Sequence, residues 1–132
     1  MKEHFDYLFF IDDDVASNYY HELILRDCDF IKEIRSFLYA RKALEYFMQS
    51  TKQSNLLIPD VVFLDINMPE IDGFEFIEKF QNLDLDSIPT IIMMSTTPNP
   101  HHKKQAQENP LILEFVNKPL TLEYLEDLKN RI

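Results

Sequence analysis

The chain has 132 residues, of which 45% are hydrophobic and 27% are charged. These values are typical of one compact globular domain and leave little room for a second. Thirteen basic and twenty-three acidic residues give a net charge of −10. This balance argues against nucleic acid or an anionic membrane as the main partner, because phosphate binding needs clustered Lys and Arg.

Two rare residue types narrow the function classes further. The single glycine, Gly73, excludes P-loop and dinucleotide-binding loops, since both need several glycines. The single cysteine, Cys28, offers neither an intramolecular disulfide nor a zinc-ligand set, and it fits a reducing, cytoplasmic location. No run of about 18 apolar residues is present, so we expect no membrane-spanning segment.

Five short apolar segments predict strands, at residues 7–11, 30–37, 61–64, 90–94 and 111–116. The first, third and fourth are nearly continuous hydrophobic runs, as expected for strands that are covered on both faces of a parallel sheet. The second carries Lys32, Glu33 and Arg35, which suits a strand at the edge of the sheet.

Stretches with helical spacing lie between and after these strands. Their apolar positions are Tyr19, Tyr20, Leu23 and Ile24 after Asp14, then Ala40, Ala43, Leu44 and Phe47, then Phe74, Ile77 and Phe80, and finally Leu122, Leu125 and Leu128 after the expected N-cap Thr121. Residues 101–109 are a weaker helix candidate, and residues 49–59 and 96–104 are expected to be long loops. This alternation predicts an α/β fold with a doubly wound, five-stranded parallel sheet.

Polar residues stand where the predicted strands end. The first strand is followed by Asp12, Asp13 and Asp14, the third by Asp65, the fourth by Ser95 and the fifth by a segment that contains Lys118. In a doubly wound parallel sheet the carboxyl ends of the strands lie along one edge, where such folds bind ligands. We therefore expect these side chains to meet in one cleft.

Each residue also has an ordinary explanation when it is taken alone. A lone aspartate after a strand is usually a helix cap or a turn residue, Lys118 alone suits the surface, and Ser95 alone carries no information. Together they favour chemistry. Several carboxylates suit Mg²⁺, which would offset their repulsion and keep Asp65 ionised as a nucleophile. A hydroxyl and an ammonium group would then stabilise an incoming phosphoryl group.

With these residues in place, the sequence resembles the receiver domain of two-component response regulators over nearly its whole length. Three motifs carry the resemblance: FFIDDD at residues 9–14, PDVVFLDINMPEIDG at 59–73 and FVNKPL at 115–120. The resemblance implies the flavodoxin-like fold with strand order 2-1-3-4-5. We accordingly expect residues 1–132 to form a single, stand-alone receiver domain.

The resemblance assigns a role to each polar residue of the motifs. Asp65 would accept the phosphoryl group and also contribute to the metal site. Asp12 and Asp13 would form the acidic pair that holds Mg²⁺, Asp13 directly and Asp12 largely through water. Asn67 would offer its backbone carbonyl to the metal. The phosphoryl donor would be a histidine kinase or a phosphotransfer protein. An unknown downstream protein would recognise the phosphorylated state.

The same resemblance implies the residues that respond to phosphorylation. Lys118 would pair with the phosphoryl oxygens, and its bond to Pro119 would be cis. Ser95 would be the switch hydroxyl, with Thr96 as the alternative if the register is shifted by one residue, and Phe115 would be the switch aromatic.

Two other functions stay open at this stage. An aspartate-based, Mg²⁺-dependent phosphohydrolase also uses an aspartate nucleophile at a strand end, but usually has a second acid two residues later, where this chain has Asn67. A receiver fold that works as a phosphorylation-independent binding module is the other alternative. Apart from these two alternatives, we expect the chain to be a phosphoacceptor and not an enzyme.

Overall fold

The computed structural model describes residues 3–53, 55–97 and 99–132. In these residues five parallel strands form one sheet in the order β2-β1-β3-β4-β5, which confirms the predicted fold class. The strands are β1 (Leu8–Ile11), β2 (Ile34–Phe37), β3 (Val61–Asp65), β4 (Thr90–Ser95) and β5 (Ile112–Asn117). All residues of β1 and β3 are buried, as the unbroken apolar runs predicted.

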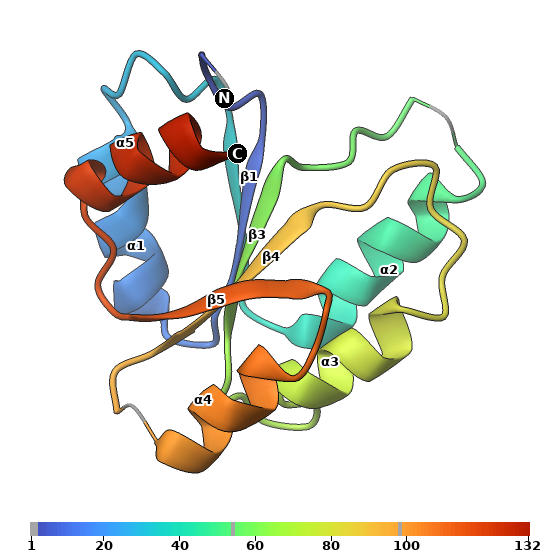
Figure 1. Cartoon of the computed structure of the whole chain (residues 1–132). Helices are drawn as coiled ribbons and strands as arrows, with labels where there is room; N and C mark the ends of the chain where they lie inside the picture. Colours follow the sequence, from blue (N-terminus) through green and yellow to red (C-terminus); the bar gives the residue numbers. More distant parts are fainter. Residues whose placement is uncertain (1–2, 54, 98) are drawn as a thin grey trace.

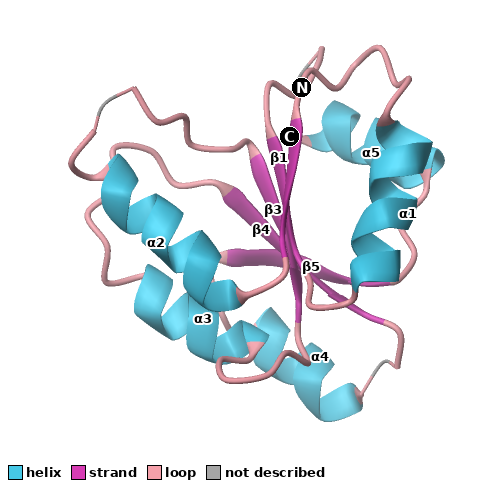
Figure 2. Ribbon diagram, turned by 180° about the vertical axis from the view of Figure 1, so that it is seen from behind, coloured by secondary structure: helices cyan, strands magenta, loops and turns pink. Residues whose placement is uncertain are grey.

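Helices cover both faces of this sheet. They are α1 (Val15–Leu25), α2 (Ala40–Ser50), α3 (Gly73–Phe80), α4 (Pro100–Gln107) and α5 (Leu122–Arg131). Figures 1 and 2 show α1 and α5 on one side of the sheet and α2, α3 and α4 on the other. Among the described residues, no helix has the length and apolar character that crossing a membrane requires.

The core consists of two apolar layers, one on each face of the sheet. Alternate residues of β1 enter opposite layers: Phe9 and Ile11 pack with α2 and α3, whereas Leu8 and Phe10 pack with α1 and α5. This separation follows from the strand period of two, which sends successive side chains to opposite faces.

The edge strand β2 is shorter than predicted. Of the expected segment 30–37, only Ile34–Phe37 pairs regularly with β1. Ile31 forms an isolated bridge with Phe5, while Lys32 and Glu33 between the two pairings are exposed. The regular ladder therefore begins only where Leu8 meets Ile34.

Helix α1 is present as predicted, but it buries a different face. Asp14 caps it by accepting hydrogen bonds from the backbone amides of Ala16 and Ser17. The apolar residues that indicated the helix are not its core: Tyr19, Tyr20 and Leu23 are exposed, and Ile24 is half-buried. The buried residues are Asn18, His21 and Leu25.

Helix α4 also forms, and it begins earlier than expected. Pro100 occupies its first turn and Asn99 caps it, accepting a hydrogen bond from the His101 amide. The connection after β4 is consequently shorter than the loop predicted over residues 96–104. Ser54 and Pro98, which belong to the two predicted loops, lie outside the described residues.

The turn between β3 and α3 brings two backbones very close together. Asp72 and Glu75 form a capping box at the start of α3. A Cβ atom at Gly73 would lie 2.8 Å from the backbone oxygen of Asp65 and 3.1 Å from the Cα of Ile66. Gly73 is therefore required by this close approach, which the sequence alone did not indicate.

Replacing Gly73 with alanine should destabilise the domain, because backbone atoms of β3 would have to move. We expect Gly73→Ala to lower the free energy of unfolding by about 2 kcal/mol, despite the higher helix propensity of alanine. Urea denaturation measures the change. Glu78→Ala, at an exposed position of the same helix, is the control and should change stability by less than about 0.5 kcal/mol. Unchanged stability of Gly73→Ala would contradict the packing argument.

Candidate functional site

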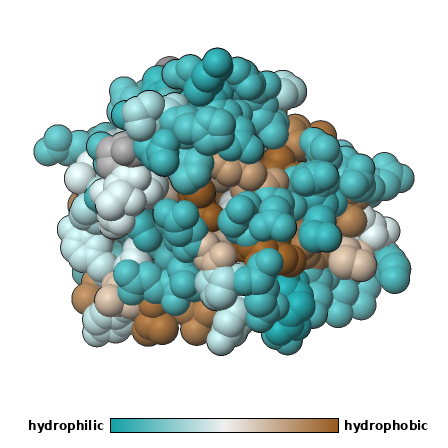
Figure 3. Space-filling view, turned by 90° about the horizontal axis from the view of Figure 1, so that it is seen from below, coloured by the Kyte–Doolittle hydropathy of each residue, from teal (hydrophilic) through white to brown (hydrophobic). Residues whose placement is uncertain are grey.

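The carboxyl ends of the strands bring the predicted residues to one edge of the sheet. Asp12 directly follows β1, and Asp65 is the last residue of β3. The residues just before them, Ile11 and Leu64, pair with each other. Ser95 ends β4 next to Asn117 of β5, so Lys118 follows immediately. This edge faces downward in Figure 1, and the view onto it in Figure 3 is largely hydrophilic with scattered apolar patches.

The ammonium group of Lys118 lies between two buried carboxylates. Its Nζ is 2.7 Å from Asp12 Oδ2 and 3.4 Å from Asp65 Oδ1. The side chains of Lys118, Asp12 and Asp65 are only 7%, 0% and 8% exposed, respectively. Buried carboxylates are costly unless they are paired, so Lys118 compensates both.

A third carboxylate completes an acidic cluster. Asp12, Asp13 and Asp65 each offer a carboxylate oxygen, and these atoms all lie within 4.8 Å of one another. Asp12 and Asp65 are buried, while Asp13 is exposed to solvent. Such a set of hard oxygen donors, open on one side, can hold a divalent cation that keeps part of its water shell.

The surroundings change the acidity of the two groups that meet at the centre. Burial, followed by the negative charge of Asp12, raises the pKa of Asp65 to about 6, although Lys118 opposes the shift. Burial by itself lowers the pKa of Lys118, but the hydrogen bond and charge of Asp12, together with Asp65, outweigh it and raise that pKa. Lys118 therefore remains charged at neutral pH.

Hydrogen bonds to and from backbone groups position the two chain segments that carry this ion pair. Asn18 Nδ2 donates to the Asp12 backbone oxygen at 2.8 Å, and the Asp14 amide donates to Asp12 Oδ1 at 3.0 Å. The Lys118 amide donates to the Ser95 backbone oxygen at 2.9 Å. The Lys118–Pro119 peptide bond is cis, as the family resemblance implied.

The remaining predicted residues lie around this centre. Ser95 is buried, and its Oγ accepts from the Thr97 amide at 3.1 Å and donates to the Thr97 backbone oxygen at 3.2 Å. Thr96 and Asn67 are exposed. Phe115 is half-buried in β5 and packs against the layer that contains α2, α3 and α4.

Two buried polar residues of α1 were not predicted. Asn18 contacts the Asp12 backbone, and His21 Nε2 accepts a hydrogen bond from the Leu120 amide at 3.1 Å. Their spacing with Leu25 follows the helical period of three and four residues, which is the signal that would have identified this face. The exposed apolar residues of α1 concealed it.

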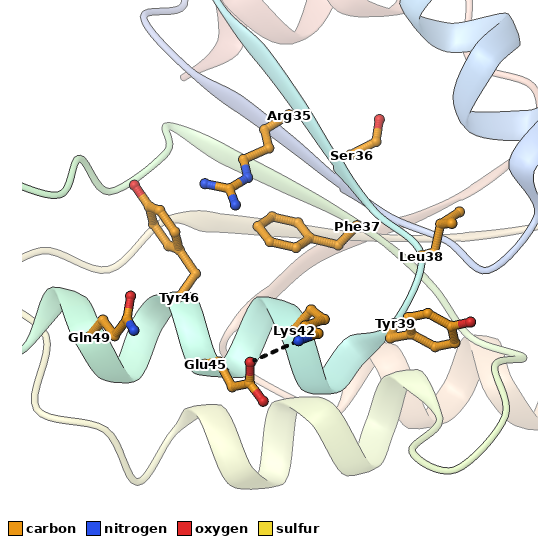
Figure 4. Close-up of a pocket in the computed structure, with 9 residues that line it drawn as sticks. All are labelled: Arg35, Ser36, Phe37, Leu38, Tyr39, Lys42, Glu45, Tyr46 and Gln49. Carbon is orange, nitrogen blue, oxygen red and sulfur yellow. Dashed lines mark ion pairs between the residues drawn. The ribbon is translucent and has the colours of Figure 1, made fainter.

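A separate groove of about 400 Å³ lies between β2 and α2 (Figure 4). The guanidinium of Arg35 is 4.8 Å from the centroid of the Phe37 ring and 5.0 Å from that of Tyr46, and Lys42 pairs with Glu45 at 3.6 Å. None of the polar strand-end residues lines this groove. The acidic cluster is therefore the candidate site for chemistry.

The fold and this cluster define a receiver domain, and comparisons with known proteins agree. The chain belongs to the response regulator receiver domain family of two-component systems, which it matches over residues 8–130. The resemblance seen in the sequence is thereby confirmed. Proteins of this family are generally phosphoacceptor signalling modules.

Solved structures of receiver proteins superimpose over nearly the whole chain. A two-component response regulator from Cytophaga hutchinsonii is 26% identical with a TM-score of 0.86, and the match covers 97% of this chain and 96% of that one. A response regulator receiver protein from Dyadobacter fermentans is 28% identical with a TM-score of 0.81, and the match covers 95% of each chain.

The matches to curated relatives cover only one part of each relative's length. An uncharacterized response regulatory protein of Vibrio cholerae is 33% identical over 85 residues, which are 64% of this chain and 33% of that protein. Three further relatives are covered over only 5% to 23% of their own length. The chain thus corresponds to one portion of these larger proteins.

The raised pKa of Asp65 predicts a specific pH dependence of stability. Because the folded-state value of about 6 lies above the ordinary 3.8, the unfolded chain loses this proton first. The contribution of the Asp65 proton to the free energy of unfolding is therefore fully present below about pH 4 and is lost as the pH rises through about 6. Near pH 7.5, with a chelator present to remove divalent cations, the free energy of unfolding of Asp65→Asn should exceed that of wild type by roughly 2 kcal/mol.

Urea denaturation of both proteins at several pH values measures this difference. The gap between Asp65→Asn and wild type should close as the pH falls below about 4, where the carboxyl group becomes protonated in both states. Asp86→Asn, at an exposed loop position, should show no comparable gap. A gap that is independent of pH would disprove the raised pKa.

Proposed function

We propose that this protein is a phosphoacceptor that takes a phosphoryl group from a histidine kinase or phosphotransfer protein onto Asp65. One observation carries the proposal: Asp65 Oδ1 lies 3.4 Å from Lys118 Nζ at a strand end, inside a cluster of three carboxylates. A structural ion pair would need only one carboxylate for each ammonium group. Here two further acids surround the pair, and this suits a site that recruits additional positive charge.

The transfer itself needs little covalent chemistry from the protein. An Asp65 carboxylate oxygen forms a bond to phosphorus while the bond from phosphorus to the donor histidine nitrogen breaks, and the ring nitrogen leaves with its electron pair. Lys118 neutralises charge on the phosphoryl oxygens. Its Nζ lies 2.7 Å from Asp12 and 3.4 Å from Asp65 in this structure, so a phosphoryl group on Asp65 would lie within reach of the ammonium group.

The donor set fits Mg²⁺. Asp13 would hold the ion directly and Asp12 largely through water, while Asp65 would add a carboxylate oxygen and Asn67 its backbone carbonyl. When it is bound, Mg²⁺ supplies positive charge that offsets the repulsion among the carboxylates and the transferred group. Ionised Asp65 is the form that acts as nucleophile, so a cation that lowers its raised pKa favours the reaction.

The response would travel through Ser95 and Phe115. The Ser95 hydroxyl is engaged with Thr97 in this structure, so contacting the phosphoryl group requires that it leave this turn. Phe115, which is half-buried beside α4, would then repack. This would shift the population between two conformations of the surface formed by α4, β5 and α5. A downstream protein in the cytoplasm would bind this surface.

Phosphorylation of the nucleophile can be detected directly. With acetyl phosphate and Mg²⁺, wild type should gain the mass of one phosphoryl group, whereas Asp65→Asn should gain none, because the amide oxygen is a poor nucleophile. Intact-mass spectrometry measures the adduct. Asp86→Asn removes an exposed carboxylate and should be modified like wild type. An adduct that persists in Asp65→Asn would refute the assignment of the nucleophile.

The metal assignment is tested by two adjacent aspartates. Asp13→Asn should weaken Mg²⁺ binding by roughly tenfold or more, since a charged ligand is lost. Asp14→Asn removes the same charge one residue later but keeps an N-cap acceptor for α1, so its affinity should stay near wild type. Isothermal titration calorimetry compares the three proteins. Equal affinities for both variants would count against Asp13 as a ligand.

A further inference from the structure

A column of stacked rings runs from α1 through β1 to β3. It lies just before the ends of the two strands, where the acidic cluster begins. The fully buried His21 ring stacks on Phe10, with centroids 5.0 Å apart and an interplanar angle of 20°. Phe10 in turn stacks on Phe63 at 5.0 Å and 17°. Phe10 stands two residues before Asp12, and Phe63 stands two residues before Asp65. His21 is therefore packed against β1, which leads to Asp12, and is linked through Phe10 to β3, which ends at Asp65.

The same histidine holds the loop that carries the ammonium group. Its Nε2 accepts a hydrogen bond from the buried Leu120 amide at 3.1 Å. Pro119 has no amide hydrogen, so the backbone donors nearest to it are those of Lys118 and Leu120. The first donates to the Ser95 backbone oxygen and the second to His21. The Lys118–Pro119 unit is thus fixed on one side by β4 and on the other by α1.

His21 is in the correct protonation state to accept this bond. Burial lowers its pKa to about 4, with Lys118 adding to the shift and Asp12 opposing it. At neutral pH the ring is uncharged, and a ring nitrogen that accepts a hydrogen bond from an amide carries no proton. The Nε2 lone pair is consequently available, and the proton resides on Nδ1.

Packing alone does not explain a histidine at this position. Among the described residues, His21 Nδ1 is a buried atom without a hydrogen-bond partner, which is unfavourable for stability. A leucine would fill the space between α1 and Phe10 without that cost, but it would leave the Leu120 amide unpaired. The acceptor at Nε2 is therefore the property that distinguishes histidine from an apolar residue here.

We infer that His21 is a positioning residue for Lys118: by accepting the Leu120 amide, it fixes the loop that places the ammonium group between Asp12 and Asp65. This inference rests on the proposed phosphoacceptor function, because Lys118 matters to the reaction only if Asp65 is phosphorylated. His21 acts through the loop and does not touch the reacting atoms.

The experiment compares side chains that differ only in the acceptor. His21→Leu removes it, whereas His21→Gln keeps an oxygen at a reach similar to that of Nε2. With acetyl phosphate and Mg²⁺, we expect His21→Leu to be phosphorylated roughly tenfold more slowly than wild type and His21→Gln to stay within about threefold. His4→Leu, the same change at an exposed position before β1, should react like wild type.

A double-mutant cycle separates positioning from general destabilisation. Lys118→Ala is combined with His21→Leu, and phosphorylation rates are measured where urea titrations show every protein to be folded. If His21 acts through Lys118, the rate difference that His21→Leu causes disappears in the Lys118→Ala background. A difference of the same size in both backgrounds would overturn the inference. If His21→Leu does not fold, His21→Asn replaces it, since its amide is one methylene too short to reach Leu120.

A measurement without phosphorylation distinguishes this inference from the proposed function. The ion-paired Lys118 ammonium group should give a protected signal in ¹⁵N NMR, which His21→Leu or His21→Asn should weaken and His21→Gln should retain. An unchanged signal in the variants without an acceptor would refute the positioning role alone. A wild-type protein that gains no phosphoryl group would refute the phosphoacceptor function, whatever the Lys118 signal shows.

Discussion

A single ammonium group shared by two buried carboxylates is the interaction on which the site depends. Asp12 is fully buried and Asp65 nearly so, and Lys118 supplies the positive charge that both contact. Because one positive charge faces three acids, the cluster retains excess negative charge at the sheet edge. That excess raises the affinity for cations, and it also makes the ionised form of Asp65 costly when no cation is present.

Both parts of this ion pair are held by hydrogen bonds from neighbouring elements. The Asp12 backbone is bound by Asn18 of α1, and the Lys118 loop is bound by Ser95 of β4 and His21 of α1. On the opposite face, α3 approaches Asp65 so closely that only glycine fits at its first residue. The site is therefore supported by contacts from both faces of the sheet.

The fold and the composition of the cluster could be predicted because both follow from short-range patterns. Unbroken apolar runs identified the central strands, and the polar residues that end them had to converge at one edge. The buried face of α1 could not be found in the same way. Asn18 and His21 are polar, and the partner that makes His21 tolerable in the core, Leu120, lies 99 residues away. Apolar periodicity favoured Tyr19 and Leu23, which the structure exposes.

The strict alternation of β1 has a consequence for how such a domain can diverge. His21, Phe10 and Phe63 belong to the layer beneath α1 and α5, whereas Phe115 packs into the layer of α2, α3 and α4. The sheet backbone separates the two. Substitutions around Phe115 can therefore change the packing on the α4 side without touching the contacts that His21 makes with Phe10 and the Leu120 amide. The packing around His21 and the packing around Phe115 thus lie on opposite sides of the same five strands and can vary separately.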